Sequence, residues 1–385
     1  MMGLLAWVIR VVYRICALLP QRNKVCFLSR QSSRPFDFQL LESAISRAFP
    51  GWEIAWACVP PSGHFGIGLA LRQVWHAATA RVCFVDGYVP AVSVPRRTRA
   101  YCVQLWHALG SIKKFGYQAL DTPDGRSSEA AEKLRMHRGY DLIVAGLPGA
   151  VPAFSEAFDC PSDRIVPLGL PRIDYLLSED YDAVRKARVA KVAYLIDAAG
   201  SRSRNEKLVL YAPTLRRGSR RGDGWFIRSI EEIRGAFCAR EDIALVVAGH
   251  PLQDEAGADQ LNDVRFLHGA ATFDVLPLVD YVVTDYSAVA FEAGLLGKKV
   301  LFYVPDIDEY RISPGLNIDP LEVFSGLSFR EADSLAHAIT SDMEGASSIE
   351  SFDVVASRYI GVVEGRSIER IVSTMIRAMG EGRVS

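Results

Sequence analysis

The sequence lacks any marked excess of one charge, since its 385 residues include 44 lysines and arginines and 45 aspartates and glutamates. Proteins that bind nucleic acid through a strong positive field carry a clear excess of basic residues. We therefore expect no nucleic-acid partner. Any binding of a charged ligand must depend on local groups of side chains.

Paired cysteines are also missing. The seven cysteines form no Cys-x-x-Cys motif, and several lie inside apolar runs such as KVCFLS and RVCFVD. An odd number of scattered cysteines is typical of reduced core residues in a cytosolic protein. We therefore expect neither a disulfide framework nor a zinc site.

The N-terminal part lacks acidic residues, because none precedes Asp37. In MMGLLAWVIRVVYRICALLP, Arg10 and Arg14 are one helical turn apart, and apolar residues cover most of the remaining circumference. The stretch is too short and too charged at its middle for a spanning helix, and no small-residue cleavage site follows it. We predict that residues 1–23 form an amphipathic helix in the membrane interface, with the two arginines facing anionic head groups. The alternative is an ordinary N-terminal helix packed on its own domain.

What the sequence does contain is a regular alternation of short apolar runs and helix-patterned stretches. Hydrophobic residues make up 49% of the chain and charged residues 23%, so a well-packed protein is expected, and the length favours two domains. The alternation is typical of parallel sheets covered by helices on both faces. The expected strands form two series: 24–29, 53–59, 81–85, 99–105, 141–145 and 164–168, and then 207–211, 243–248, 264–267, 280–284 and 299–303.

The two series predict two doubly wound, Rossmann-like α/β domains, over residues 24–177 and 207–385. Between them, residues 178–206 change from a charged helical pattern to small and polar residues, and we place the linker there. The apolar spacing in RSIERIVSTMIRAMGEG predicts a closing helix that ends the second domain or crosses back onto the first.

Domains of this kind bind ligands at the carboxyl ends of their strands, and three such ends carry polar residues. The first is in QLWHALGSIKKFG, where His107 follows a strand and could take a proton from an attacking hydroxyl. Ser111, Lys113 and Lys114 follow, and the lysines could hold an anionic group of the incoming molecule. The alternative is a core histidine beside solvated lysines.

The second strand end is VVAGHPLQD, in which His250 directly precedes Pro251 and could face a phosphate. This short motif is weak support by itself. The alternative is a histidine with no ligand.

The third strand end is DYVVTDYSAVAFEAGLLGKKVLFY, where Asp285 and Ser287 lie at the turn between a strand and a helix. The free amides and the positive dipole end of such a helix can bind a phosphate without a metal. Thr284 and Ser287 add hydroxyl groups, and Glu292 could reach ribose hydroxyls together with Asp285. The alternative is a plain crossover capped by Asp285 or Ser287.

Asp306 and Asp308 in PDIDEY have the Asp-x-Asp spacing that some glycosyltransferases use to hold a divalent metal. A single such pair carries little information in a chain with 45 acidic residues. We expect a surface turn here and predict no metal site.

Taken together, five stretches make the chain resemble the CDP-glycerol glycerophosphotransferase family of teichoic-acid and related wall-polymer synthesis, over about residues 1 to 310. They are QLWHALGSIKKFG, LPRIDYL, VLYAPTLR, GHP and DVLPLVDYVVTDYSAVAFEAGLLGKKVLFYVPDIDEY. The resemblance implies a glycosyltransferase-B fold, with two Rossmann-like domains facing across a cleft. It also implies a peripheral enzyme on the cytoplasmic face of the bacterial membrane.

Members of this family transfer glycerol phosphate from CDP-glycerol to a hydroxyl of a lipid-linked acceptor and release CMP, and no cofactor or metal is implied. The resemblance makes His107 the base. It places His250, Thr284 and Ser287 on the donor diphosphate and Glu292 on the ribose. A displacement at phosphorus mainly requires that the hydroxyl be aligned and that charge on the leaving group be stabilised.

The sequence departs from the family pattern in two places. Ala108, Leu109 and Gly110 replace the common Gly-Thr-Pro, and RISPGLNIDPLEVFSG replaces a segment with Pro-Gly-Pro after Tyr310. CDP-ribitol or another CDP-alditol therefore stays open as the donor. The large additional domain of many polymerases is missing, which favours a short transferase or primer enzyme. The alternatives are an enzyme of the same fold that uses a UDP- or GDP-sugar, and a membrane-associated scaffold without activity.

Overall fold

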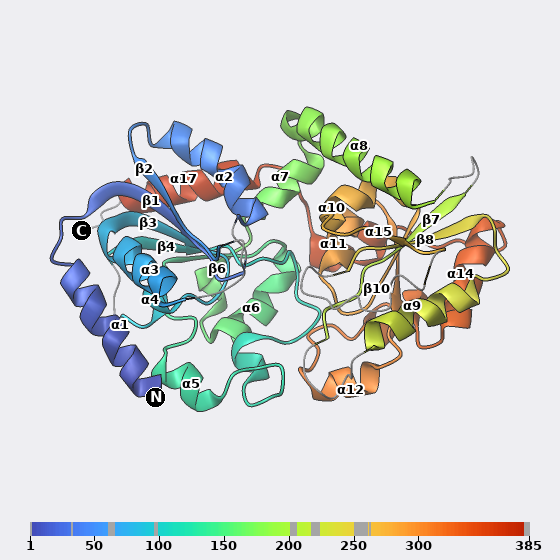
Figure 1. Cartoon of the computed structure of the whole chain (residues 1–385), viewed down its shortest axis with the longest axis horizontal. Helices are drawn as coiled ribbons and strands as arrows, with labels where there is room; N and C mark the ends of the chain where they lie inside the picture. The colour runs from blue at the N-terminus through green and yellow to red at the C-terminus, as the bar shows by residue number, and fades with distance from the viewer. Residues whose placement is uncertain are drawn as a thin grey trace. The chain divides into compact units, whose positions relative to one another are not determined.

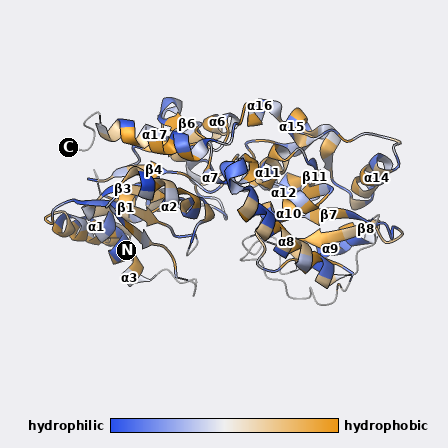
Figure 2. Ribbon diagram, turned by 90° about the horizontal axis from the view of Figure 1, so that it is seen from above, coloured by the Kyte–Doolittle hydropathy of each residue, from blue (hydrophilic) through white to orange (hydrophobic). Residues whose placement is uncertain are grey.

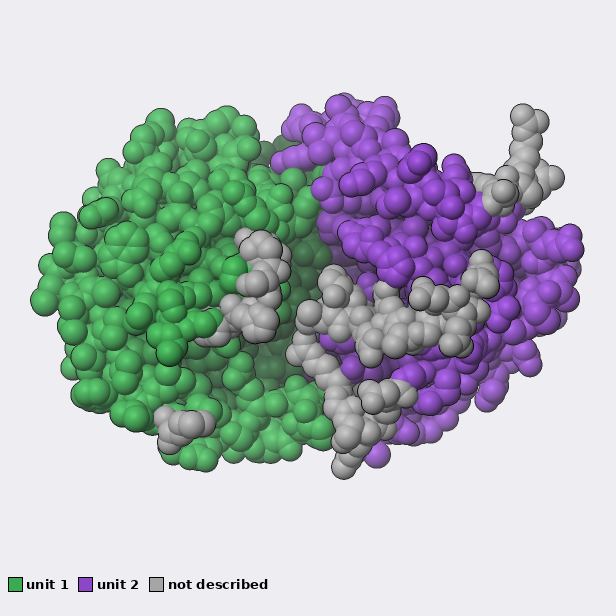
Figure 3. Space-filling view, in the orientation of Figure 1, with its two compact units in different colours: residues 1–110, 115–175, 362–385 green, residues 111–114, 176–361 purple. Residues whose placement is uncertain are grey.

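The computed structural model describes residues 2–31, 34–60, 66–95, 99–200, 206–216, 224–249, 261 and 263–380. The chain divides into two compact units (Figure 3), of which unit 1 comprises residues 1–110, 115–175 and 362–385, and unit 2 comprises residues 111–114 and 176–361. Over the described ranges, no helix combines the length and the hydropathy needed to cross a bilayer.

Unit 1 is built on a six-stranded parallel sheet with the strand order β2-β1-β3-β4-β5-β6. Helices α2 (Phe36–Ala48) and α17 (Ser367–Gly380) pack together on one side, and α3 (Ile67–Thr79) lies against the sheet on the other (Figure 1). The strands are β1 (Arg22–Leu28), β2 (Glu53–Ala57), β3 (Ala80–Val85), β4 (Tyr101–Gln104), β5 (Leu142–Val144) and β6 (Ile165–Val166).

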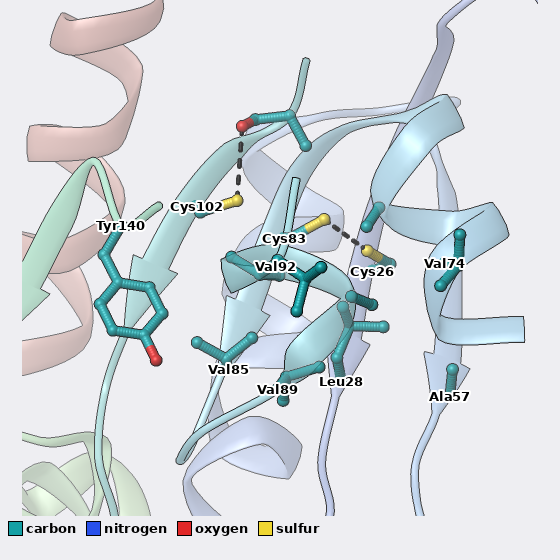
Figure 4. Close-up of a cluster of buried hydrophobic side chains, with 14 of the residues drawn as sticks. Cys26, Leu28, Ala57, Val74, Cys83, Val85, Val89, Val92, Cys102 and Tyr140 are labelled. Atoms are coloured by element: carbon teal, nitrogen blue, oxygen red, sulfur yellow. Dashed lines mark hydrogen bonds between the residues drawn. The ribbon is translucent and has the colours of Figure 1, made fainter. Parts of the chain in front are cut away.

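Small apolar side chains fill the space between the unit 1 sheet and its helices. Cys26, Cys83 and Cys102 are register partners on β1, β3 and β4, and all three are fully buried. Figure 4 shows them side by side, with the Sγ atoms of Cys26 and Cys83 2.9 Å apart. None of the seven cysteines, all of which the structure describes, forms a disulfide, so these three act as small core residues, as the sequence predicts.

Unit 2 repeats the architecture, with a six-stranded parallel sheet in the order β12-β11-β10-β7-β8-β9. The prediction of two Rossmann-like α/β units is confirmed, although the two-residue strand β12 was not predicted. The strands are β7 (Lys207–Tyr211), β8 (Ile243–Val247), β9 (Arg265–Phe266), β10 (Tyr281–Thr284), β11 (Lys299–Tyr303) and β12 (Ser328–Phe329). The helices of unit 2 that are discussed below are α8 (Asp182–Ala199), α9 (Trp225–Ala236), α10 (Thr272–Val275), α11 (Val289–Leu295), α12 (Ile307–Ile312) and α14 (Ala332–Met343).

The boundaries between the units differ from those expected. Most of the span 178–206, where we placed a linker, is helix α8, which packs on α10 inside unit 2. The Arg188 guanidinium donates from Nε to Asp274 Oδ1 at 3.1 Å and from Nη2 to Asp274 Oδ2 at 2.6 Å. The charged helical pattern therefore belongs to a helix of unit 2, which an ion pair joins to α10. Helix α17 belongs to unit 1.

The N-terminal helix α1 (Met2–Cys16) packs on unit 1 through Ala6, Ile9 and Tyr13, which are buried. The backbone amide of Arg99 donates to the Tyr13 hydroxyl at 2.8 Å. Arg10 donates from Nε to the carbonyl of Val94 at 3.3 Å, so this side chain turns toward the protein and not outward as expected. Hydrophobic residues make up much of α1 (Figure 2). Those with exposed side chains include Leu4, Leu5, Trp7, Val8 and Ile15.

Candidate functional site

His107 lies just beyond β4 in unit 1, in a turn that its neighbours hold in place. Gln104 donates from its side chain to the carbonyl of Gly87 at 3.0 Å, and its side-chain oxygen accepts from the amide of Trp106 at 2.8 Å. Trp106 has a φ of 58°, a left-handed conformation that is strained for a bulky residue. The Trp106 ring stacks on Phe115 with the ring centroids 4.5 Å apart, which stabilises the turn.

The imidazole of His107 is exposed, and its Nδ1 lies 2.9 Å from the backbone carbonyl oxygen of Asp86. A carbonyl oxygen can only accept a hydrogen bond, so Nδ1 carries the proton in the neutral ring. The lone pair is then on Nε2. In this tautomer Nε2 is the nitrogen that can accept a proton.

Asp86, whose backbone carbonyl contacts His107, directly follows β3. The Asp86 carboxyl group is buried; Ser29 donates to Oδ2 at 2.7 Å, and Oδ1 has no hydrogen-bond partner among the described residues. Burial raises the pKa of Asp86 to about 7, although the hydrogen bond from Ser29 lowers it in part. Buried groups with a strongly shifted pKa are common in active sites. The sequence analysis did not identify this residue.

The segment Ser111–Lys114 belongs to unit 2 and not to the unit that contains His107. Lys113 forms an antiparallel bridge with Leu316, and Lys114 donates from its amide to Gly315. Ser111 is buried; its hydroxyl donates to the Lys113 carbonyl at 2.8 Å and accepts from the Asn317 amide group at 3.0 Å. To donate a hydrogen bond to the acceptor substrate, the Ser111 hydroxyl would have to break its bond to the Lys113 carbonyl. The roles expected for the two lysine side chains stay predictions.

In unit 2, the residues after β10 form the turn that the sequence indicated, but two of them face inward. Thr284 is fully buried, and its hydroxyl donates to the carbonyl of Ala212 at 2.7 Å. Asp285 is also fully buried, and its Oδ1 accepts from the amide and the hydroxyl of Thr214, at 2.8 and 2.7 Å. Direct contacts of these two side chains with a donor, as expected from the sequence, therefore do not occur in this conformation. Both residues instead join the end of β10 to the end of β7.

Ser287 and Glu292 lie at the start of α11. Ser287 is half-buried and accepts from the amide of Val289 at 3.4 Å, so its side chain lies at the open end of the helix. Glu292 is buried in the first turn. Their expected roles toward phosphate and ribose stay predictions.

Arg216 is the residue of this region that the sequence analysis missed. Its side chain is 4% exposed, and it forms ion pairs with Asp285 and Asp306. The expectation of a surface turn was therefore wrong for Asp306, because its carboxylate forms an ion pair with a buried guanidinium. Asp308, two residues later, is exposed and pairs with Arg330. The signal was present in VLYAPTLR, which places an arginine shortly after the strand.

His250 and Pro251 lie outside the described residues, so the expected diphosphate contact of this motif stays a prediction. Within the described ranges, no group of three or more histidine, cysteine, aspartate or glutamate side chains is arranged to hold a metal ion.

Comparison with known families decides the identity. Residues 11–377 match the family described as CDP-glycerol:poly(glycerophosphate) glycerophosphotransferase. The chain belongs to this family. The match covers both units and every strand end considered above.

Individual relatives agree with this membership. The chain is 32% identical over 305 residues to the teichoic acid ribitol-phosphate primase of Bacillus spizizenii, covering 78% of this chain and 75% of the relative. It is 26% identical over 276 residues to the teichoic acid glycerol-phosphate primase of Bacillus subtilis, covering 70% and 67%. The solved structure of the wall teichoic acid polymerase TagF matches with a TM-score of 0.70 at 18% identity, covering 96% of this chain and 93% of that chain. At this identity, the last comparison supports the fold alone.

Proposed function

We propose that the protein transfers an alditol phosphate from a CDP-linked alditol to a hydroxyl group of a lipid-linked acceptor in wall-polymer synthesis. Family membership supports the reaction class, and two relatives are a ribitol-phosphate and a glycerol-phosphate primase. The orientation of His107 is the observation that supports a role for a particular residue in this reaction. The Asp86 carbonyl holds its Nδ1, which leaves the lone pair on Nε2.

In the proposed step, the acceptor hydroxyl gives its proton to Nε2 of His107 while its oxygen forms a bond to the phosphorus of the alditol phosphate. The bond between that phosphorus and the bridging oxygen breaks, and the electron pair leaves with CMP. The diphosphate is held by Ser287, by the amides at the start of α11 and by His250, and Glu292 contacts the ribose. Lys113 and Lys114 attract the phosphates of the acceptor.

We further propose that the enzyme acts as a peripheral protein at the cytoplasmic face of the bacterial membrane, where a lipid-linked acceptor is found. The support is the exposed apolar face of α1, which includes Leu4, Trp7 and Ile15. Such a face can enter the head-group region without spanning the bilayer.

A donor panel tests the proposed reaction. The purified protein is incubated with a lipid-linked acceptor and radiolabelled CDP-ribitol, CDP-glycerol, UDP-sugars or GDP-sugars. We expect label to pass to the acceptor from a CDP-alditol, with one CMP released for each unit transferred. CDP-ribitol is the first donor to test, because identity to the ribitol-phosphate primase is higher, 32% against 26%. Transfer from a UDP- or GDP-sugar alone would overturn the proposal.

A further inference from the structure

Three residues that are distant in the sequence form a buried charge cluster at the carboxyl end of the unit 2 sheet. The Arg216 guanidinium donates from Nε to Asp306 Oδ2 at 3.1 Å and from Nη2 to Asp306 Oδ1 at 3.3 Å. On its other side, Nη1 lies 2.7 Å from Asp285 Oδ2, in an ion pair whose angle falls short of a hydrogen bond. The side chains of Arg216, Asp285 and Asp306 are 4%, 0% and 11% exposed. The cluster is therefore largely removed from water.

Aromatic rings enclose the guanidinium. Its central carbon lies 3.8 Å from the ring centroid of Trp225 and 4.7 Å from that of Tyr310. Tyr310 stacks on Tyr286 with a centroid separation of 3.7 Å, and the Tyr286 hydroxyl donates to Asp306 Oδ1 at 3.0 Å. Planar guanidinium groups pack well against such faces, and the enclosure fixes where the charge can lie.

The cluster is connected directly to the turn that begins α11. Asp285 Oδ1 accepts from the amide of Tyr286 at 2.5 Å and from the amide of Thr214 at 2.8 Å. The position of the Asp285 carboxylate therefore fixes the backbone one and two residues before Ser287. The carboxylate is in turn held by Arg216, and Asp306 orients Arg216 from its opposite side.

We propose that Arg216 and Asp306 are positioning residues that set the affinity for the CDP-linked donor, by holding the turn 285–287 through Asp285. This inference depends on the proposed function, in which that turn binds the donor diphosphate. Neither residue needs to touch the donor, because each acts through the Asp285 carboxylate.

The ionisation of the cluster agrees with this role. Burial disfavours the charged form of Arg216, but Asp285 and the other nearby negative groups outweigh it and raise its pKa above the usual value. Burial and the Asp306 carboxylate raise the pKa of Tyr286, so its hydroxyl stays a donor. One cation between two carboxylates leaves an excess of one negative charge. Removing the charge of Asp306 therefore leaves a balanced pair of Arg216 and Asp285, and the variant should fold.

The test compares Asp306→Asn with Asp308→Asn, its neighbour in the same Asp-x-Asp motif, whose carboxylate is exposed. Donor binding to the purified full-length variants is measured by calorimetry, and steady-state transfer is measured with the same CDP-alditol. For Asp306→Asn we expect Kd and KM for the donor to rise about tenfold and kcat to change less than about threefold. For Asp308→Asn, the donor Kd, KM and kcat should equal those of the wild type. Arg216→Lys, which keeps the charge but not the planar fork, should also raise KM.

Whether KM or kcat changes distinguishes a loss of donor positioning from a loss of folded enzyme. A purely structural role would reduce the fraction of folded enzyme, and so lower the apparent kcat while KM stays constant. That result, or equal donor Kd values for Asp306→Asn and Asp308→Asn, would overturn the inference and leave the proposed function intact. If the wild type binds neither CDP-ribitol nor CDP-glycerol, the proposed function fails and the inference fails with it.

Discussion

At the scale of single residues, the strand-end histidine shows how backbone groups fix the orientation of a side chain. His107 is fixed by the Asp86 carbonyl on one side, and Trp106 precedes it in a left-handed conformation that the stacked ring of Phe115 stabilises. A strained residue persists only where its surroundings hold it, and such strain is common at active sites. The geometry supports a role for the histidine in the reaction rather than in the core.

Replacing His107 with Asn tests the proposed base. We expect kcat to fall by about 10² to 10⁴-fold, because general base catalysis is lost. Donor Kd should change less than about twofold, since the residues proposed to bind the donor lie in unit 2. His337→Asn, at an exposed histidine on α14, is the matched control and should retain full activity. A His107→Asn enzyme with wild-type kcat would rule out the proposed base.

Asp86 predicts a dependence of stability on pH. Its pKa is about 7 in the folded protein because of burial, and about 3.9 in an unfolded chain. Between these values the folded state holds a proton that the unfolded state has lost, so the stability that this group contributes falls as the pH rises from about 4 to about 7. The loss amounts to at most about 4 kcal/mol.

The Asp86→Asn variant removes that titration. Urea unfolding at pH 4.5, 6 and 7.5 should show a smaller decrease in the free energy of unfolding for Asp86→Asn than for the wild type. Asp124→Asn, at an exposed aspartate of the same unit, should follow the wild-type curve. Parallel curves for Asp86→Asn and the wild type would contradict the shifted pKa.

At the scale of elements, a short motif explains how the end of the chain is attached. The motif LPRIDYL contains Asp174, whose carboxylate accepts from the amides of Ser367 at 2.6 Å and Ile368 at 2.8 Å. These amides begin α17 and have no partner inside the helix. Helix α17 buries Ile371 and Met375 and packs on α2. Asp174 therefore caps a helix almost two hundred residues further along the chain.

Replacing Asp174 with Asn should weaken this attachment, because an amide offers one acceptor oxygen in place of two. We expect the free energy of unfolding to fall by about 1 to 3 kcal/mol and hydrogen exchange to become faster across Ser367–Gly380. Asp333→Asn, at an exposed aspartate in the first turn of α14, should cost less than about 0.5 kcal/mol. Unchanged exchange in α17 would show that apolar packing alone holds the helix.

At the scale of the whole molecule, one face of α1 is buried against unit 1 and the other is exposed. Ala6, Ile9 and Tyr13 attach the helix to unit 1, while Leu4 and Trp7 on the outer face are 65% and 59% exposed. Exposed apolar side chains grouped on one helix commonly mark a surface that binds a partner or a membrane. Deleting the helix would also remove the contact between Tyr13 and Arg99, so point substitutions are the better test.

The double variant Leu4→Ser and Trp7→Ser tests membrane binding. We expect the wild type to float with vesicles that contain phosphatidylglycerol, less so at high salt, and the variant to bind at least about tenfold more weakly. The control is Val184→Ser with Tyr194→Ser, which replaces two exposed apolar residues of α8 in unit 2. Full flotation of the Leu4 and Trp7 variant would exclude α1 as the membrane anchor.

The sequence by itself determined the elements and their chemistry along the chain. Runs such as KVCFLS and KLVLY specify buried strands because the pattern of apolar residues is local. The positions of His107 after β4 and of Ser287 before α11 follow from the same local pattern. The family motifs could be recognised for this reason, since each lies within one strand and the turn after it.

Only the tertiary structure decided which distant residues meet. Arg216 and Asp306 are 90 positions apart and come together because β7 and β11 both flank β10. The segment Ser111–Lys114 pairs with residues 315–318 in unit 2, and α17 returns to unit 1. Strand order and the crossing of the chain between units depend on packing over the whole molecule, which no local pattern encodes. For this reason the sequence pattern predicted a surface position for Asp306, whereas the structure shows it as a buried ion-pair partner of Arg216.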